Sequence, residues 1–101
     1  MDGLQLGGKW SVTLTKRVEK QLEKIPDVVV QRVFALVYEI EKFGPLRYNW
    51  KNFGKLQGTE DYYHCHIQKG RPTYVVCWKV VDKKIQIVEV YYVGTHEKAP
   101  Y

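Results

Sequence analysis

The fold is decided by residues 61–93, which read DYYHCHIQKGRPTYVVCWKVVDKKIQIVEVYYV. This stretch holds three segments rich in tyrosine, valine, isoleucine and tryptophan: Asp61–Gln68, Thr73–Val81 and Lys84–Val93. β-Branched and aromatic residues favour strands, and the short connections Lys-Gly-Arg-Pro and Asp-Lys between them are typical of hairpin turns. These residues therefore predict a three-stranded antiparallel meander.

A strand and a short helix are predicted near the start of the chain. Lys9–Thr15 alternates apolar and polar side chains, as a half-buried strand does. The Thr15 hydroxyl is then suited to cap a helix, because it can accept a hydrogen bond from a free N–H of the first turn. Apolar residues at helical spacing predict that this helix covers Lys16–Ile25 and that Pro26 ends it.

A second helix is predicted over Val28–Lys42, with Asp27 as its N-cap and Gly44–Pro45 as its end. Its predicted buried face consists of Val30, Val33, Phe34, Val37 and Ile40. Two short helices joined by a tight turn form an antiparallel hairpin. One strand, a helical hairpin and a meander in this order predict an α+β fold, with both helices packed on one face of the sheet.

Length and composition restrict the class of protein. With 101 residues, of which 45% are hydrophobic, the chain can form one core but not two. We therefore expect a single domain over residues 9–101 behind a flexible, glycine-rich lead over residues 1–8. No apolar run approaches the ~20 residues that cross a bilayer, and the start has no signal-peptide pattern, so we expect a cytoplasmic protein without a membrane partner. Cys65 and Cys77 fit neither a disulfide framework nor a common metal motif.

The net charge of +5 is concentrated in residues 42–58, which contain four cations and no acidic residue. The cations Lys42, Arg47, Lys51 and Lys55 alternate there with the aromatic residues Phe43, Tyr48, Trp50 and Phe53. Cations that contact phosphates and rings that stack on bases suit single-stranded nucleic acid. The alternative is an ordinary loop whose aromatic side chains fill a gap in the core while its lysines face water.

Histidines form the second candidate feature. Residues i and i+2 of a strand share a face, so His64 and His66 lie together, whereas Cys65 and Ile67 should face the helices. Three interpretations remain open for the pair: a metal site, which lacks a third ligand; two idle surface histidines; or a general acid or base. His96, directly after the last predicted strand, is the third histidine and can reach the same face.

Short motifs in this order resemble a known family. Lys55–Gly58 (Lys-Leu-Gln-Gly) precedes the meander, and Cys65–Ile67 (Cys-His-Ile) is followed by Gly94–His96 (Gly-Thr-His). Together with the order of strand, helices and meander, these motifs resemble the RelE/ParE toxin superfamily of bacterial toxin–antitoxin modules, most closely its YafQ-like branch. The resemblance covers nearly all of Trp10–Tyr101 and implies a RelE-like fold.

The resemblance implies the toxin of a type II toxin–antitoxin system, a ribosome-dependent endoribonuclease that needs neither cofactor nor metal. It would enter the A site of the 30S subunit and cleave the bound mRNA. By position, His66 and His96 would be the acid and base, and Tyr101 lies near the terminal aromatic residue of the branch. Lys51 and Lys55 fall where relatives carry cations for the RNA backbone. The basic charge also suggests an acidic antitoxin as partner.

The chain departs from the family at five positions. His64 and Gly70 stand where the YafQ-like branch has acidic residues, and Gly54 lies near the position of a further histidine. His66 and Val75 each replace an arginine of the RelE branch. The chain therefore has fewer candidate acid and base groups than either branch, and His64 or Glu89 could compensate for those that are missing.

Histidine catalysis has a simple chemical basis. A base removes the proton of the ribose 2′-OH, the oxygen attacks the adjacent phosphate, and an acid protonates the leaving oxygen, while cations stabilise the charge on the phosphorane. The candidate catalytic residues are His66, His96, Tyr101 and His64, and the candidate RNA-binding residues are Lys51, Lys55, Arg47, Arg71 and Trp50. Two alternatives remain: a ParE-like inhibitor of gyrase with the same fold, and a non-catalytic RNA-binding or interaction domain.

Overall fold

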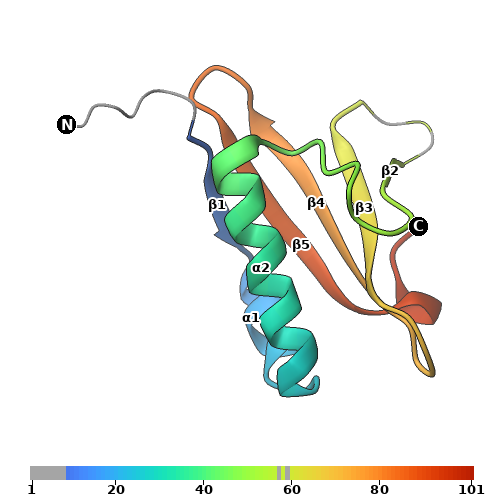
Figure 1. Cartoon of the computed structure of the whole chain (residues 1–101). Helices are drawn as coiled ribbons and strands as arrows, with labels where there is room; N and C mark the ends of the chain where they lie inside the picture. The colour runs from blue at the N-terminus through green and yellow to red at the C-terminus, as the bar shows by residue number, and fades with distance from the viewer. Residues whose placement is uncertain (1–8, 57, 59) are drawn as a thin grey trace.

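A computed structural model of the chain describes residues 9–56, 58 and 60–101. The predicted flexible lead, residues 1–8, lies outside the described residues. Two helices lie against one face of a five-stranded sheet, and no α-helix among these residues covers the other face (Figure 1). The predicted α+β class, with the helices on one face, is confirmed.

The elements follow the predicted order, with one addition. They are β1 (Ser11–Leu14), α1 (Lys16–Leu22), α2 (Asp27–Phe43), β2 (Gly54–Lys55), β3 (Tyr62–Gln68), β4 (Tyr74–Asp82), β5 (Ile87–Thr95) and a 3₁₀ turn (His96–Lys98). The sheet order is β1-β5-β4-β3-β2, with β1 parallel to β5 and the remaining pairs antiparallel. The meander is confirmed as β3, β4 and β5, and the two-residue strand β2 was not predicted.

Caps set the ends of the helices. The backbone N–H of Val18 donates to the Thr15 hydroxyl at 3.1 Å, so the predicted cap is confirmed. The helix ends at Leu22 rather than Ile25, because the N–H of Glu23 bonds three residues back to the Lys20 carbonyl and tightens the last turn. Asp27 is the first residue of α2 and not its cap.

Pro26 takes the N-cap position of α2 instead. Its carbonyl accepts from the N–H groups of Val29 and Val30, and no side chain caps the helix. Asp27 then lies in the first turn, where its negative charge favours the positive end of the helix dipole.

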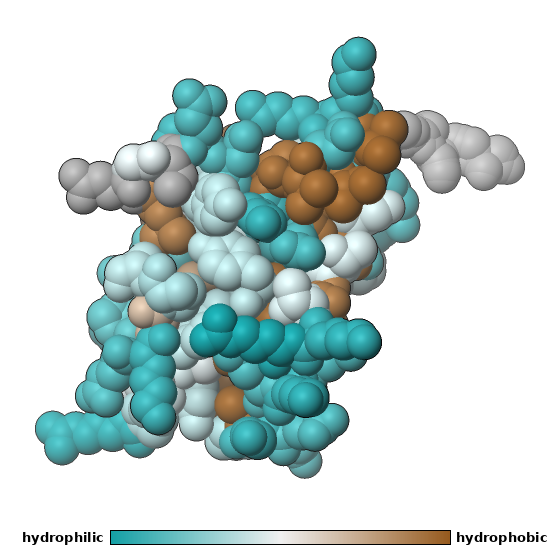
Figure 2. Space-filling model, turned by 180° about the vertical axis from the view of Figure 1, so that it is seen from behind, coloured by the Kyte–Doolittle hydropathy of each residue, from teal (hydrophilic) through white to brown (hydrophobic). Residues whose placement is uncertain are grey.

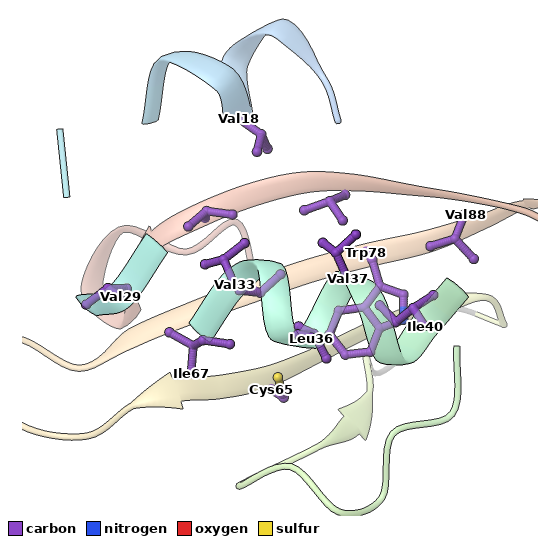
Figure 3. Packing of buried hydrophobic residues seen from close by; sticks show 13 residues of the cluster. Val18, Val29, Val33, Leu36, Val37, Ile40, Cys65, Ile67, Trp78 and Val88 are labelled. Carbon is purple, nitrogen blue, oxygen red and sulfur yellow. The ribbon is translucent and has the colours of Figure 1, made fainter. Parts of the chain in front are cut away.

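The buried face of α2 differs from the predicted one. Val29, Val33, Leu36, Val37 and Ile40 are buried, and Figure 3 shows their side chains among those of the strands. The predicted position of Phe34 in this face is wrong, since its side chain is 48% exposed. Val30 is only partly buried. Both sets contain Val33, Val37 and Ile40 and satisfy a helical period, so the sequence is equally compatible with a buried face that extends toward Phe34 or toward Leu36.

Aromatic side chains of the loop between α2 and β2 complete the core beside the helices. The Phe53 ring stacks on Tyr63 and Trp78, with ring centroids 5.7 and 5.9 Å apart. Trp50 also packs against the core cluster, and the Trp78 indole N–H donates to the Pro45 carbonyl at 3.1 Å. For Phe53 and Trp50, the gap-filling alternative is therefore what the fold uses.

The outer face of the sheet carries a smaller apolar cluster of its own. Val75, Cys77 and Tyr92 are buried there, and Tyr91 and Ala99 pack against them. Cys77 thus lies on the opposite face from Cys65, which belongs to the main core, and both thiols are free. Among the described residues, no helix has the length and apolar character that crossing a lipid bilayer requires.

Candidate active site

Strand β3 positions the two neighbouring histidines. Cys65 and Ile67 are buried in the core under the helices, as predicted. Because side chains alternate along a strand, His64 and His66 face the opposite side, the outer face of the sheet. Figure 2 shows this face: it is largely hydrophilic, and its apolar atoms gather at the upper end, on the side of the β4–β5 turn.

The segment after β5 brings the third histidine to the same face. The backbone N–H of His96 donates to the Thr73 carbonyl, just before β4, at 2.8 Å. The Tyr92 hydroxyl donates to the Thr95 carbonyl at 2.8 Å and so holds the end of the strand. Gly94 makes this arrangement possible, because a Cβ at this position would lie 2.6 Å from the Tyr92 hydroxyl oxygen.

Four aromatic side chains form a cluster on the outer face. The ring centroids of His66 and His96 are 5.3 Å apart, with the rings at 68° to each other. Tyr101 packs against two of the histidines: its ring centroid lies 4.7 Å from that of His64 and 6.1 Å from that of His96. The structure thus brings together all four candidate catalytic residues.

Burial favours the neutral form of the imidazoles of His64 and His66 by lowering their pKa. It lowers the pKa of His66 below 6.5, and the neighbouring charges of His96, Lys69 and Lys51 lower it further. Burial lowers the pKa of His64 as well, with smaller effects from His66 and His96. In both rings the Nδ1 atom is buried and has no hydrogen-bond partner among the described residues. Burial also raises the pKa of the Tyr101 hydroxyl to about 12, so this group keeps its proton at neutral pH.

His66 lies between two clefts. One, of 520 Å³, contains His66 and His96 together with Arg71, Thr73 and Glu97. The other, of 280 Å³, lies between α2, the loop before β2 and the end of β3. The backbone N–H of His66 donates to the Lys51 carbonyl at 2.8 Å, which fixes this loop beside the histidine. A neutral imidazole next to a second imidazole and several cations can exchange protons with an anionic substrate.

Comparison with known proteins identifies the fold. Three solved structures are similar over most of the chain. The archaeal RelE–RelB complex from Pyrococcus horikoshii OT3 gives a TM-score of 0.71 at 22% identity, covering 90% of this chain and 99% of that one. The chain has the RelE-like fold.

Two further structures agree with this assignment. A double arginine-to-alanine mutant of the E. coli toxin RelE in the free state gives a TM-score of 0.70 at 22% identity, covering 90% of this chain and 87% of that one. The YoeB dimer from Staphylococcus aureus gives 0.65 at 16% identity, covering 88% and 99%. No protein-family model matches the sequence, and no curated protein is similar to it in sequence.

Two of the candidate RNA-binding residues make internal contacts in this RelE-like fold. One carboxylate oxygen of Glu39, on α2, accepts hydrogen bonds from the Trp50 indole at 2.8 Å, the Asn49 amide at 3.0 Å and the Arg47 guanidinium at 3.2 Å. We refer to these four residues as the Glu39 clamp. The loop has no acidic residue of its own, so the sequence did not reveal that a helical carboxylate neutralises Arg47.

The remaining candidate RNA-binding residues, and Glu89, do not all lie near the histidines. Lys51 and Arg71 line the clefts on either side of His66. Lys55 pairs with Tyr63 across β2 and β3 and lines a different groove, together with Phe43 and Trp10. Glu89 forms an ion pair with Lys79 at 3.6 Å at the far end of the sheet and does not join the histidines.

Sequence reasoning missed two cations of the site, Arg32 and Lys69, which line the smaller cleft with Lys51. Arg32 is an exposed residue of α2, and only its position in space connects it with the histidines. Lys69 was assigned to a turn. Among residues 9–56, 58 and 60–101, no three His, Cys, Asp or Glu side chains lie close enough to hold a metal ion.

Proposed function

We propose that this protein is the toxin of a bacterial type II toxin–antitoxin system and acts as an endoribonuclease on mRNA. The observation that carries the proposal is the pair His66 and His96, whose ring centroids lie 5.3 Å apart in one cleft, with cations lining this cleft and the next. The RelE-like fold supports it, because solved structures with this fold include the toxin RelE. A gyrase inhibitor of the same fold would have no use for such a pair.

His66 is the proposed general base. Its lowered pKa keeps the imidazole neutral at neutral pH, so it can accept the proton of a ribose 2′-OH. The 2′ oxygen then forms a bond to the adjacent phosphorus, and the bond from phosphorus to the 5′ oxygen breaks. This displacement leaves a 2′,3′-cyclic phosphate on one product.

His96 is the proposed general acid, which in its protonated form gives a proton to the leaving 5′ oxygen. Because its ring lies beside that of His66, we propose that both imidazoles act on one phosphate bound against them. Arg71, which lines the same cleft as both histidines, stabilises the negative charge that develops on the phosphorane. Every proton and charge in this route is assigned to a side chain of the protein, and we therefore propose that cleavage needs no metal ion or other cofactor.

His64 and Tyr101 complete the proposed site from the side of β2. The His64 ring packs on Tyr101, and Tyr101 in turn packs on His96. This contact holds the tail over the sheet and so keeps His96 near His66. The Tyr101 hydroxyl stays protonated and can donate a hydrogen bond to a bound phosphate.

The ribosome is the proposed source of an oriented substrate. Both clefts are open and His96 is exposed, so the protein alone encloses little of a flexible RNA strand. Holding mRNA in the A site of the 30S subunit would orient the 2′ oxygen for attack, and such orientation contributes several kcal/mol to catalysis. The protein would accordingly act in the cytoplasm.

An acidic antitoxin is the proposed partner. One solved structure of this fold is a complex of RelE with RelB. The chain has a net charge of +5, and its clefts expose several cations. A partner with an acidic, amphipathic segment would cover these charges and suppress cleavage.

The test is cleavage of ribosome-bound mRNA by His66→Ala and His96→Ala. Each variant should cleave 10²- to 10⁴-fold more slowly than the wild type, roughly the contribution of one general acid or base. Lys20→Ala removes an exposed cation from α1, away from the site, and serves as the control. Circular dichroism and thermal unfolding establish that the variants are folded.

Three results would contradict the proposal. Full activity of either histidine variant would exclude the assigned pair. Equal cleavage of free and ribosome-bound RNA would exclude the role of the ribosome. Inhibition of DNA supercoiling by gyrase, without cleavage of RNA, would identify the ParE-like alternative instead.

A further inference from the structure

Three cations from separate parts of the chain meet in the smaller cleft beside His66. Arg32 comes from α2, Lys51 from the loop before β2, and Lys69 from the residues after β3. We refer to this 280 Å³ space as the three-cation cleft. Its other lining groups include the side chains of Asn49, Trp50 and Gln68, and no acidic residue lines it.

The charges of this cleft are not neutralised within the described part of the chain. The Glu39 carboxylate accepts hydrogen bonds from Asn49 and Trp50, which line the cleft, but its ion pair is with Arg47 at 3.2 Å. The other ion pairs among the described residues join Lys79 to Glu89 and Lys83 to Asp61. Three like charges around one cleft repel one another unless an anion binds between them.

Hydrogen bonds hold the wall of the cleft at a fixed position relative to His66, the proposed base. The hydrogen bond from the backbone N–H of His66 to the Lys51 carbonyl joins the loop that forms one wall of the cleft to β3, and the Glu39 clamp joins the same loop to α2. Lys69 and Lys51 are close enough to His66 to lower the pKa of its imidazole. An anion bound in the cleft would therefore lie next to the reacting group at a fixed position.

We propose that the three-cation cleft is a phosphate subsite, which binds the RNA phosphodiester next to the one that is cleaved. The guanidinium of Arg32 and the ammonium groups of Lys51 and Lys69 bind the phosphate oxygens, and the amides of Asn49 and Gln68 provide further hydrogen-bond donors. The strand continues past His66 into the larger cleft with His96. This inference rests on the proposed function in that it takes RNA to be the ligand.

The test measures binding separately from cleavage. A fluorescent 2′-O-methyl RNA oligonucleotide, whose blocked 2′ oxygen prevents cleavage, is titrated with the protein at several KCl concentrations. Each phosphate contact to a single strand contributes about −0.7 to the slope of log Kobs against log salt concentration. Because the cleft binds one phosphate, the triple variant Arg32→Gln, Lys51→Gln, Lys69→Gln should give a slope less negative by about 0.7.

A second triple variant has the same net charge. Lys16→Gln, Lys20→Gln, Lys24→Gln removes three exposed cations in and just after α1, which packs against β5 and β1. It should keep the wild-type slope. An unchanged slope for the cleft variant would overturn the subsite, and so would an equal loss in both triple variants, since binding would then follow net charge alone.

The two proposals fail in different ways. If the wild type cleaves ribosome-bound mRNA and the cleft variant binds the oligonucleotide with the wild-type slope, only the subsite is excluded. If the wild type shows the cleft-dependent slope but cleaves no RNA, the nuclease proposal is excluded and the subsite is supported.

Discussion

Replacing Glu39 by alanine removes the acceptor of the Glu39 clamp. The carboxylate oxygen receives three donors, from Arg47, Asn49 and Trp50, at 3.2, 3.0 and 2.8 Å. The clamp fixes the loop that carries Lys51 to the C-terminal half of α2. We therefore expect Glu39→Ala to destabilise the fold and to loosen the wall of the three-cation cleft.

The magnitude follows from the burial of each donor. A hydrogen bond to a charged group contributes roughly 1.5–3 kcal/mol when buried. The Arg47 side chain is only 14% exposed and would lose its counter-ion, whereas Asn49 is exposed and can bond to water instead. The Glu39 side chain itself is 27% exposed, which weakens all three bonds. We expect the free energy of unfolding to fall by about 2–3 kcal/mol.

The pH dependence gives an independent check. Burial raises the pKa of Glu39, but the hydrogen bonds from Asn49, Trp50 and Arg47, with the charge of Arg47, lower it by more, so it lies below 4.5. The native state therefore keeps this carboxylate ionised at lower pH than the unfolded chain does. The stabilisation is complete above pH 4.5 and disappears as the pH falls through the native pKa.

Urea unfolding followed by tryptophan fluorescence measures this effect. Glu39→Ala should lose stability at neutral pH, and its difference from the wild type should narrow at pH values below 4.5. Glu39→Gln keeps a carbonyl oxygen for Trp50 and should lose less. Glu23→Ala, at an exposed glutamate, should change stability by no more than about 0.5 kcal/mol. If Glu39→Ala and Glu23→Ala are equally stable at neutral pH, the clamp does not stabilise the fold.

Four further predictions follow from the site. The kcat/KM for cleavage should rise with pH around a midpoint below 6.5, because the neutral form of His66 is the base; a midpoint above 7 in a pH–rate profile would contradict this role. Protein dialysed against EDTA, and then against buffer, should cleave ribosome-bound mRNA at the untreated rate. Lys51→Ala should lower kcat/KM by roughly tenfold, whereas Lys55→Ala, in the other groove, should leave it within about twofold in the same assay. Gly94→Ala places a Cβ 2.6 Å from the Tyr92 hydroxyl oxygen and should cost about 1–3 kcal/mol in thermal unfolding; an unchanged Tm would show that the ring moves freely.

The spacing of apolar residues along the sequence located the strands and helices. A helix or strand that is buried on one face repeats its apolar residues with the period of that element. Alternation placed Cys65 and Ile67 in the core and His66 on the outer face, and the structure agrees. The same reasoning chose the wrong face of α2. Phe34 and Leu36 border the face of Val33, Val37 and Ile40 on opposite sides and both are apolar, and the sheet that selects Leu36 is distant in sequence. A helical period identifies the centre of the buried face, but it does not decide which residues at the border of that face are buried.

The loop between α2 and β2 has no regular spacing of apolar residues from which its contacts could be predicted. Its cations and rings suited both nucleic acid and core packing, and the structure divides them. Phe53 fills the core, Arg47 pairs with Glu39, and Lys51 lines a cleft. Pairing of the two-residue strand β2 decides that Lys55 is opposite Tyr63, and hence which face it occupies. These outcomes depend on partners that are distant in sequence, which explains why local pattern could not predict them.

The approach of His96 to His66 depends on the turn after β5 and not on the sheet. β4 lies between β3 and β5, so the backbones of these two strands are separated by two strand spacings, about 10 Å. Side chains on β3 and β5 at that separation would not bring imidazole centroids to 5.3 Å. His96 lies beyond the strand, where its N–H bonds to the Thr73 carbonyl and the chain turns back across β4. A substitution that loosens this turn should therefore separate the imidazoles, and slow cleavage, without altering either histidine.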